Sequence, residues 1–294
     1  WGAGGDAKMG ERAAEESEKE IRDALKNAEL VFITSGMGGG TGTGAAPIVA
    51  KIAKESGALV VGVVTKPFEF EGARRAKVAD EGINELRKHC DTLLAIPNER
   101  LSIICEEEIT TENAFRMADD VLRIGIQSIA EIVTTRGEIN TDFADVNAIM
   151  RNAGPAWMSI GYGTGEDRAL EAVRQALSNP LLDMTIDGAT GVLFNIVGGT
   201  DLKLSELEIA ANEINKLADP TVNMIFGMGT DEKMNSEIRV TIIATGFDTP
   251  GSLIETEENY VGYLNEVQNE EVDGIFSPLD LPPFLRKYTN AKSG

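Results

Sequence analysis

Residues 36–44 read GMGGGTGTG, with six glycines in nine positions. The run follows an apolar segment, 30–34, that predicts a buried strand, and it precedes a helix predicted over 45–56. Glycines let the backbone approach a ligand closely, and a helix N-terminus presents unpaired N–H groups to an anion. Thr41 and Thr43 add hydroxyl donors. The stretch therefore predicts a phosphate-binding loop within an α/β fold.

Three other interpretations of this loop are weaker. A Walker A loop ends in Gly-Lys-Ser/Thr, and no lysine stands there. Residues 40–45 fit the loose dinucleotide pattern GxGxxA, but the next strand ends at 64–67 without the acid that would bind a ribose hydroxyl. A turn without a ligand would lose much chain entropy on fixing six glycines.

The sequence around the loop alternates between helical and strand patterns. Helices are predicted over 11–28 and 73–90, and further strands over 58–64 and 91–96. Strands that are apolar on both faces and separated by helices indicate a parallel sheet covered on both sides. A long helix follows over 111–135, with apolar residues at three- and four-residue spacing.

From about residue 145 the pattern changes to that of a second, α+β domain. Its first elements are expected over 157–160, 167–177, 191–197 and 205–217. The last two strands, 222–226 and 238–244, are expected to pair with each other around a polar turn.

Composition narrows the class of protein. Forty-eight acidic residues against 27 basic ones give a net charge of −21, which argues against a nucleic-acid partner. The apolar run 58–64 is far too short to span a bilayer, and no signal peptide is recognised, so a cytoplasmic protein without direct membrane insertion is expected. Cys90, Cys105 and the single His89 are interpreted as structural, with no metal site.

The C-terminal part divides into two segments of opposite character. Residues 250–278 hold seven acids and no base, which predicts a disordered acidic linker. The segment Leu279–Lys287, LDLPPFLRK, is apolar and basic. It is interpreted as a short peptide that docks onto partners, the alternative being a sticky terminus without function.

Residues 38–44, GGGTGTG, resemble the signature of the tubulin/FtsZ GTPase family. The extended form at 35–47 resembles its FtsZ branch, the GTPases of bacterial cell division, more than eukaryotic tubulin. Other segments resemble family motifs in the same order: 65–75, 96–98, 140–146, 244–247 and 279–287. The resemblance implies a tubulin-like, Rossmann-type parallel sheet, a long central helix, a second α+β domain and a disordered tail.

The resemblance also implies a division of the chain into five parts. These are the remainder of a GTP-binding domain (1–110), the central helix (111–136), a C-terminal α+β domain with the synergy loop (137–249), the linker (250–278) and the tail peptide (279–294).

By position, the resemblance implies a site for GTP or GDP with Mg²⁺. The residues expected to contact the nucleotide are Gly38, Gly39, Gly40, Thr41, Gly42, Thr43, Gly44, Glu71, Arg75, Asn98 and Asp119. Asp119 falls near the guanine, where a carboxylate can accept hydrogen bonds from N1–H and the exocyclic amine. Residues 2–5 resemble the loop that senses the γ-phosphate.

The catalytic groups implied by the family are Asp142, Asp145 and Asn140. In the family this loop inserts over the nucleotide of the neighbouring subunit, where the acids orient the attacking water. The implied partners are other copies of the chain, joined head to tail, and membrane-tethering division proteins bound through Leu279–Lys287. The implied location is the division ring at mid-cell. Without the family, the same acids after a helix would be interpreted as helix capping.

The resemblance begins part-way into the nucleotide domain. The family's first strand and first phosphate loop are not found, so the chain is expected to be an N-terminally truncated fragment, with the first strands of the sheet missing, poor nucleotide affinity and doubtful activity alone. A non-enzymatic filament-capping or interaction protein is the first alternative. A tubulin-like filament for plasmid movement or cell shape is the second, and the tail peptide favours division over it.

Overall fold

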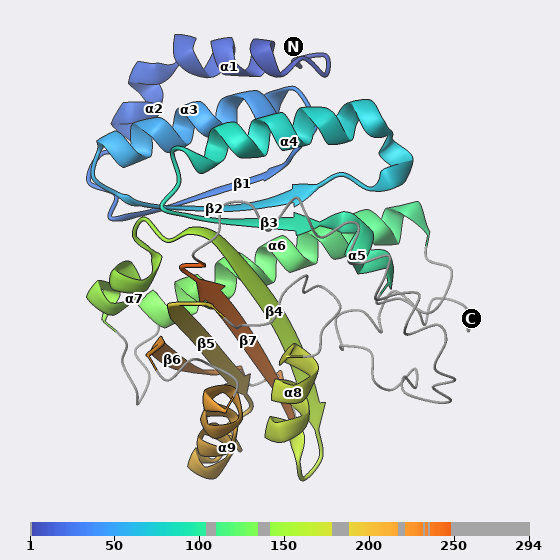
Figure 1. The fold of residues 1–294 in the computed structure, drawn as a ribbon, viewed down its shortest axis with the longest axis vertical. Helices are drawn as coiled ribbons and strands as arrows, with labels where there is room; N and C mark the ends of the chain where they lie inside the picture. Colours follow the sequence, from blue (N-terminus) through green and yellow to red (C-terminus); the bar gives the residue numbers. More distant parts are fainter. Residues whose placement is uncertain are drawn as a thin grey trace.

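The computed structural model describes residues 2–103, 110–134, 142–177, 188–216, 221–231, 233–234 and 236–247. Asn140, Cys105, the acidic linker and the tail peptide lie outside the described residues. The strands form one seven-stranded sheet in the order β1-β2-β3-β4-β7-β5-β6 (Figure 1). The predicted mixed α/β class is confirmed.

The first four strands of the sheet are parallel: β1 (Leu30–Gly36), β2 (Leu59–Lys66), β3 (Thr92–Pro97) and β4 (Gly154–Thr164). In β2 every residue except the last is buried. A continuous apolar strand is needed here because helices cover both faces of the sheet. β3 and β4 pair over only three residues each, which joins the two parts of the sheet.

One face of the parallel strands carries α3 (Thr41–Glu55) and α4 (Ala73–Arg87), which pack over Val60 and Val64. A further layer, α1 (Ala7–Glu16) and α2 (Glu18–Ala24), lies over α3 (Figure 1). The prediction of one helix over 11–28 was wrong, because the chain leaves helical geometry at Ser17. The break turns α2 so that Arg22 reaches Glu55 of α3 at 2.8 Å.

The opposite face carries α6 (Thr111–Thr134), which contacts β2 and β6. Its buried residues belong to a core shared by both halves of the sheet; they include Met117, Val121, Ile124 and Ile129. The shorter elements η1 (Glu69–Glu71), α5 (Asn98–Ile103) and α7 (Phe143–Met150) lie at the ends of the strands. Among the described residues, no helix has both the length and the apolar character needed to cross a membrane.

The second half of the sheet contains β5 (Gly191–Gly198), β6 (Asn223–Thr230) and β7 (Glu237–Thr245). The expected pairing of the last two strands was wrong: β5 lies between them, parallel to β6 and antiparallel to β7. All eight residues of β5 are buried, and such a strand is most stable with a neighbour on each side.

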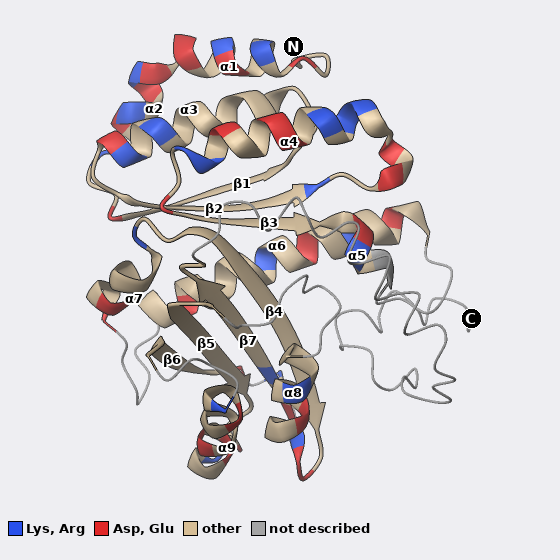
Figure 2. Ribbon diagram, in the orientation of Figure 1, with Lys and Arg blue, Asp and Glu red and all other residues tan. Residues whose placement is uncertain are grey.

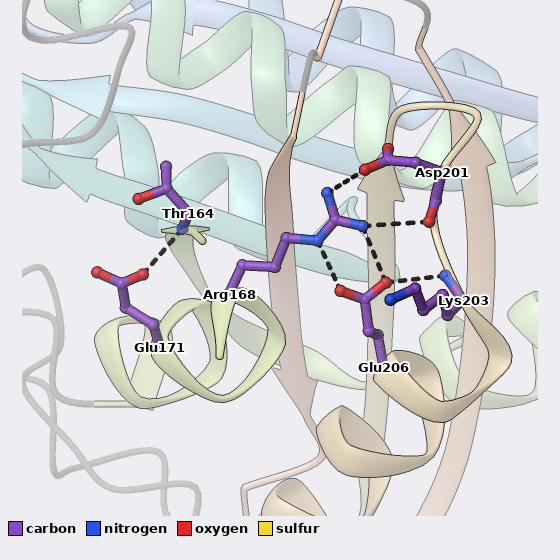
Figure 3. Close-up of polar contacts among 6 residues, drawn as sticks. All are labelled: Thr164, Arg168, Glu171, Asp201, Lys203 and Glu206. Atoms are coloured by element: carbon purple, nitrogen blue, oxygen red, sulfur yellow. Dashed lines mark hydrogen bonds and ion pairs between the residues drawn. The ribbon is translucent and has the colours of Figure 1, made fainter. Parts of the chain in front are cut away.

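Two helices, α8 (Arg168–Leu177) and α9 (Leu204–Asn215), cover this half of the sheet. They are joined by an ion cluster in which Arg168 and Glu206 are buried and Asp201 is half-exposed (Figure 3). The guanidinium of Arg168 donates to both oxygens of Glu206, at 2.6 and 2.9 Å, and to the carboxylate of Asp201 at 2.7 Å. The bond to Glu206 raises the pKa of Arg168, and the bond from Arg168 lowers the pKa of Glu206. Elsewhere charged residues gather on the outer helices and are sparse on the strands (Figure 2).

Candidate functional site

The glycine-rich loop leaves β1 at the carboxyl edge of the parallel strands and enters α3 at once. Helix α3 begins at Thr41, four residues before the predicted start. Residues 41–44 are therefore the first helical turn, and only residues 37–40 form the connecting loop. Glycine has a low helix propensity, so the sequence pattern did not predict this turn. Close packing against α1 stabilises it in the folded protein.

Packing explains three of the loop's glycines. A Cβ on Gly44 would lie 1.9 Å from the carbonyl oxygen of Ala7, and one on Gly40 would lie 2.7 Å from the Cβ of Ala3. A Cβ on Gly42 would lie 2.0 Å from the hydroxyl oxygen of Ser35. These glycines let the N-terminal segment and the end of β1 approach α3.

The two glycines of the loop that line an open hollow, Gly38 and Gly39, differ in their packing. Gly38 has a φ of 97°, and a Cβ there would lie 2.7 Å from the carbonyl oxygen of Arg75, so the loop also abuts α4. A Cβ on Gly39 would meet no atom within 4 Å. The Gly38 N–H donates to the buried hydroxyl of Thr43 at 2.9 Å, which gives Thr43 a structural role in shaping the loop.

The backbone of this turn offers a set of hydrogen-bond donors. The N–H groups of residues 39–43 have no acceptor within the part of the chain that the structure describes. They include the first turn of a 15-residue helix, where unpaired donors and the helix dipole together favour an anion.

An open hollow of about 430 Å³ lies beside these donors. Its lining residues come from three segments that are far apart in the sequence: Gly4, Gly5, Gly38, Gly39, Glu71, Arg74, Arg75 and Val78. The structure thus brings together two of the predicted glycines with Glu71 and Arg75. Arg74 and Val78 were not anticipated, since their position on the first turns of α4 became informative only once α4 was placed.

Glu71 holds the segment between β2 and α4 in shape. Its side chain is only 7% exposed, accepts the backbone N–H of Phe68 at 3.0 Å and pairs with Arg75 at 2.7 Å. The neighbouring Glu69 N–H donates to the carboxylate of Glu99 at the start of α5, at 2.9 Å. Together these bonds fix one wall of the hollow.

Asn98 lies at the carboxyl end of β3, on the same edge of the sheet, but outside the lining of the hollow. It is 4% exposed, and its buried Oδ1 has no hydrogen-bond partner within the described part of the chain. A buried polar atom without a partner is unusual in a folded protein, so this oxygen is suited to accept from a bound ligand.

An aromatic cluster links the same edge to α6. Phe68 stacks on Phe70 with ring centroids 5.1 Å apart, and Phe115 of α6 meets both rings edge-on. Phe115 is 41% exposed, and Asp119 lies one helical turn further on the same face. Phe115 was missed because its spacing fits the apolar stripe of α6, and only its exposure distinguishes it from core residues.

The predicted catalytic acids Asp142 and Asp145 lie elsewhere. They form a capping box on α7, in which Asp142 accepts the N–H of Ala144 at 3.3 Å and Asp145 accepts the N–H of Asp142 at 3.3 Å. Both side chains are exposed. The end of α7 is anchored at the amino ends of the strands, because Thr92 at the start of β3 donates to the Met150 carbonyl.

The acids and the hollow therefore lie at opposite edges of the sheet (Figure 1). Strand β2 runs from one edge to the other with eight residues, or roughly 25 Å at about 3.3 Å per residue. The structure brings Glu71 and Arg75 to the glycine loop, places Asn98 and Asp119 on the same edge, and leaves Asp142 and Asp145 remote.

Comparisons with known proteins identify the arrangement. A family model described as the Tubulin/FtsZ family, GTPase domain, matches residues 1–106, and one described as the FtsZ family, C-terminal domain, matches residues 154–248. The chain is similar to an empty FtsZ dimer from M. jannaschii, with 47% identity over 83% of this chain and 71% of that one, at a TM-score of 0.81. This chain belongs to the FtsZ family.

Two further solved structures are similar to this FtsZ-family chain. The W319Y mutant of M. jannaschii FtsZ also matches at 47% identity and a TM-score of 0.81, over 83% of this chain and 74% of that one. CetZ2 from Haloferax volcanii, solved as a GTPγS-bound protofilament, has 20% identity over 90% of this chain and 80% of that one, at a TM-score of 0.66; this likeness shows the fold alone.

Membership establishes the class of activity. The protein is a tubulin-like, guanine-nucleotide-binding GTPase of the filament-forming cell-division type, as the sequence motifs predicted. The dinucleotide interpretation of the glycine loop is excluded, and the non-enzymatic interpretation does not describe the family. Assignment of individual residues to the nucleotide and to catalysis remains a prediction.

The described residues of this FtsZ-family chain contain no group of three or more His, Cys, Asp or Glu side chains that could hold a metal ion. The candidate nucleotide site can still take Mg²⁺ without such a group, since Mg²⁺ keeps several waters and binds mainly to substrate phosphates. Cys90 is buried, which raises the pKa of its thiol to about 12 and agrees with a structural role.

Proposed function

We propose that the protein hydrolyses GTP at a site shared between two copies joined head to tail. One observation carries this proposal: the hollow with its glycine donors and the exposed acids of α7 occupy opposite edges of one sheet, roughly 25 Å apart. A single chain cannot bring them together. A head-to-tail repeat brings the α7 edge of one copy to the hollow of the next.

The nucleotide occupies the carboxyl edge of the parallel strands. The phosphates meet the N–H groups at Gly39, Gly40 and the first turn of α3. Glu71 and Arg75 form the wall beside the ribose. Phe115 offers its exposed face to the base and Asp119 accepts from guanine, one turn apart on α6. The buried oxygen of Asn98 accepts a ligand hydrogen bond.

The catalytic acids act from the neighbouring copy. Asp142 and Asp145 stand exposed at the start of α7, held in position by their reciprocal capping bonds. Two carboxylates placed there accept hydrogen bonds from a water and direct it at the terminal phosphate. Asn140 precedes them in the sequence. Mg²⁺ bound to the phosphates would neutralise part of their charge.

The same proposal covers assembly and location. The M. jannaschii relative was solved as an FtsZ dimer, which supports self-association of this chain. We assign filaments of it to the division ring of the cytoplasm, tethered through Leu279–Lys287 to membrane-bound division proteins. In this protein we assign residues 1–110 to the GTP-binding domain, 111–136 to the central helix, 137–249 to the C-terminal domain, 250–278 to the linker and 279–294 to the tail peptide.

The test is GTP hydrolysis by the full-length protein as a function of its concentration. The rate per subunit should rise with concentration, because the site forms only between copies. Asp142→Asn and Gly39→Val should each be inactive, since one lacks a catalytic acid and the other has a filled hollow.

Mixing these two inactive variants in equal amounts should restore hydrolysis at up to roughly a quarter of the interfaces, where an intact hollow meets an intact α7. A rate per subunit that stays constant with concentration, together with a mixture that remains inactive, would reject the shared site. No hydrolysis by the unsubstituted protein at high concentration with Mg²⁺ would reject the function altogether.

A further inference from the structure

Two adjacent arginines at the start of α4 line the hollow but differ in their partners. Arg75 pairs with Glu71 at 2.7 Å, and that carboxylate is 7% exposed. Arg74 has no hydrogen-bond or ion-pair partner among the residues that the structure describes, and its side chain is exposed. The chain therefore places one neutralised and one unneutralised guanidinium in the same wall.

The unneutralised state of Arg74 is informative in this protein. Acidic residues outnumber basic ones by 48 to 27, so a surface arginine has many carboxylates available to it. Lys66, at the carboxyl end of β2, is paired with Asp80 at 2.8 Å. Arg74 lines the hollow together with Gly4, Gly39 and Glu71, and the carboxylate of Glu71 is already paired with Arg75.

Helix geometry directs Arg74 at the hollow. Arg74 and Val78 are four residues apart on α4 and both line it, whereas Lys77 on the same helix does not. The first turn of α4 also touches the glycine loop, since the Arg75 carbonyl oxygen lies 2.7 Å from the Cβ position of Gly38. Arg74 thus lines the same hollow as Gly39, which carries one of the unpaired N–H donors.

We propose that Arg74 binds the phosphate chain of the nucleotide and so favours nucleotides with more phosphates. This inference rests on the proposed function, because it assumes a guanine nucleotide in the hollow. A guanidinium offers several donors in a planar fork that matches phosphate oxygens, and it is always charged. The backbone N–H groups of the glycine loop can orient the phosphates but carry no net charge. Arg74 supplies a positive charge beside them.

The two arginines then have separate tasks. Arg75 acts through Glu71, which fixes the wall between β2 and α4, so its loss should weaken binding of every guanine ligand to a similar extent. Arg74 acts on phosphate charge, so its loss should matter more as phosphates are added. This contrast separates a direct contact from a general disturbance of the wall.

The experiment measures dissociation constants of the full-length protein for GTP, GDP and guanosine, at low and at physiological salt. The variants are Arg74→Gln, Arg74→Lys, Arg75→Gln and the matched control Lys77→Gln, which removes the same charge from the same helix. Arg74→Gln should weaken GTP binding about 5- to 10-fold, GDP binding less and guanosine binding hardly at all. The effect should shrink as salt increases, and Arg74→Lys should recover part of it.

Equal GTP affinity of Arg74→Gln and Lys77→Gln would overturn the inference while leaving the proposed function intact. So would normal GTP binding by Arg74→Gln with assembly shifted to higher protein concentration, since the guanidinium would then meet a neighbouring copy. Failure of the unsubstituted protein to bind GTP, with a folded spectrum, would overturn the proposed function and this inference together.

Discussion

The two functional edges of the sheet are built in contrasting ways. At the carboxyl edge, Gly40, Gly42 and Gly44 allow backbone segments to approach more closely than any side chain would permit, and the hollow is assembled from distant segments. At the amino edge, Asp142 and Asp145 come from four consecutive residues and are held by one local capping box. The proposed nucleotide surface depends on tertiary packing, whereas the proposed pair of catalytic carboxylates depends only on the start of one helix.

This contrast predicts different responses to substitution. The α7 edge should lose chemistry without losing stability, because its side chains are exposed. At the hollow, substitution of a glycine whose added Cβ would clash with neighbouring atoms should lower the stability of the protein. Substitution of a glycine whose added Cβ would meet no atom should instead weaken nucleotide binding.

The largest effect is expected for Asp142→Asn and Asp145→Asn. Asparagine is as good an N-cap as aspartate at position 142, and its side-chain oxygen can accept the same backbone N–H at position 145, so α7 should stay folded while the charge is lost. GTP hydrolysis should fall by about 10²- to 10⁴-fold with GTP affinity unchanged. Steady-state hydrolysis and equilibrium binding measure the two effects. Equal losses of binding and hydrolysis would show that these acids belong to the hollow rather than to a neighbour's site.

The next effect concerns the ion cluster of α8 and α9, which lies away from both edges. Arg168→Met would leave the carboxylate of Glu206 buried without its partner (Figure 3). The free energy of unfolding should fall by about 3–5 kcal/mol. GTP affinity should not change while the protein is folded. Denaturant unfolding and nucleotide binding are the measurements. A large loss of GTP affinity by the fully folded variant would show that the ion cluster and the nucleotide site are not independent.

A matched pair of glycine substitutions sharpens the comparison within the hollow. Gly44→Ala places a Cβ against backbone atoms of α1 and should destabilise the protein by about 2–3 kcal/mol, despite the better helix propensity of alanine. Gly39→Ala meets no atom within 4 Å and should leave stability within about 0.5 kcal/mol, yet weaken GTP binding. Urea unfolding of both variants tests this order; equal stability of the two would refute the packing argument.

The smallest effect is a pH dependence. Arg168 lowers the pKa of Glu206 in the folded protein below its ordinary value of 4.5. Between the lowered pKa of the folded protein and 4.5, the unfolded chain therefore binds more protons than the folded one. The contribution of this ion pair to stability is complete above pH 4.5 and is lost as the pH falls further. Glu206→Gln should unfold with a shallower acid dependence than the exposed control Glu208→Gln. Parallel unfolding curves for the two would exclude this role.

Much of the fold followed from local patterns. Strands β1, β2 and β3 and helices α4 and α6 lie close to their predicted ranges, since burial on one or both faces leaves a clear pattern in the sequence. Errors arose where local pattern and tertiary packing differ. The break at Ser17 and the early start of α3 depend on how α1 and α2 lie across α3, and β6 and β7 looked like partners only because they are close in sequence.

The sequence by itself determined the family, through several ordered motifs, and with it the activity and the residue types that GTP chemistry requires. Helix capping by Asp142 and Asp145 was only the alternative interpretation of the sequence, and the helix α7 that they cap was not predicted. Only the tertiary structure decided which residues share a wall: Arg74 joined the hollow, the buried Oδ1 of Asn98 has no partner in the described part of the chain, and the predicted catalytic acids lie at the other end of the strands. The physical reason is the distance along the chain over which each interaction acts. Capping and periodicity act over a few residues, whereas a pocket is defined by segments that meet only after the sheet has formed.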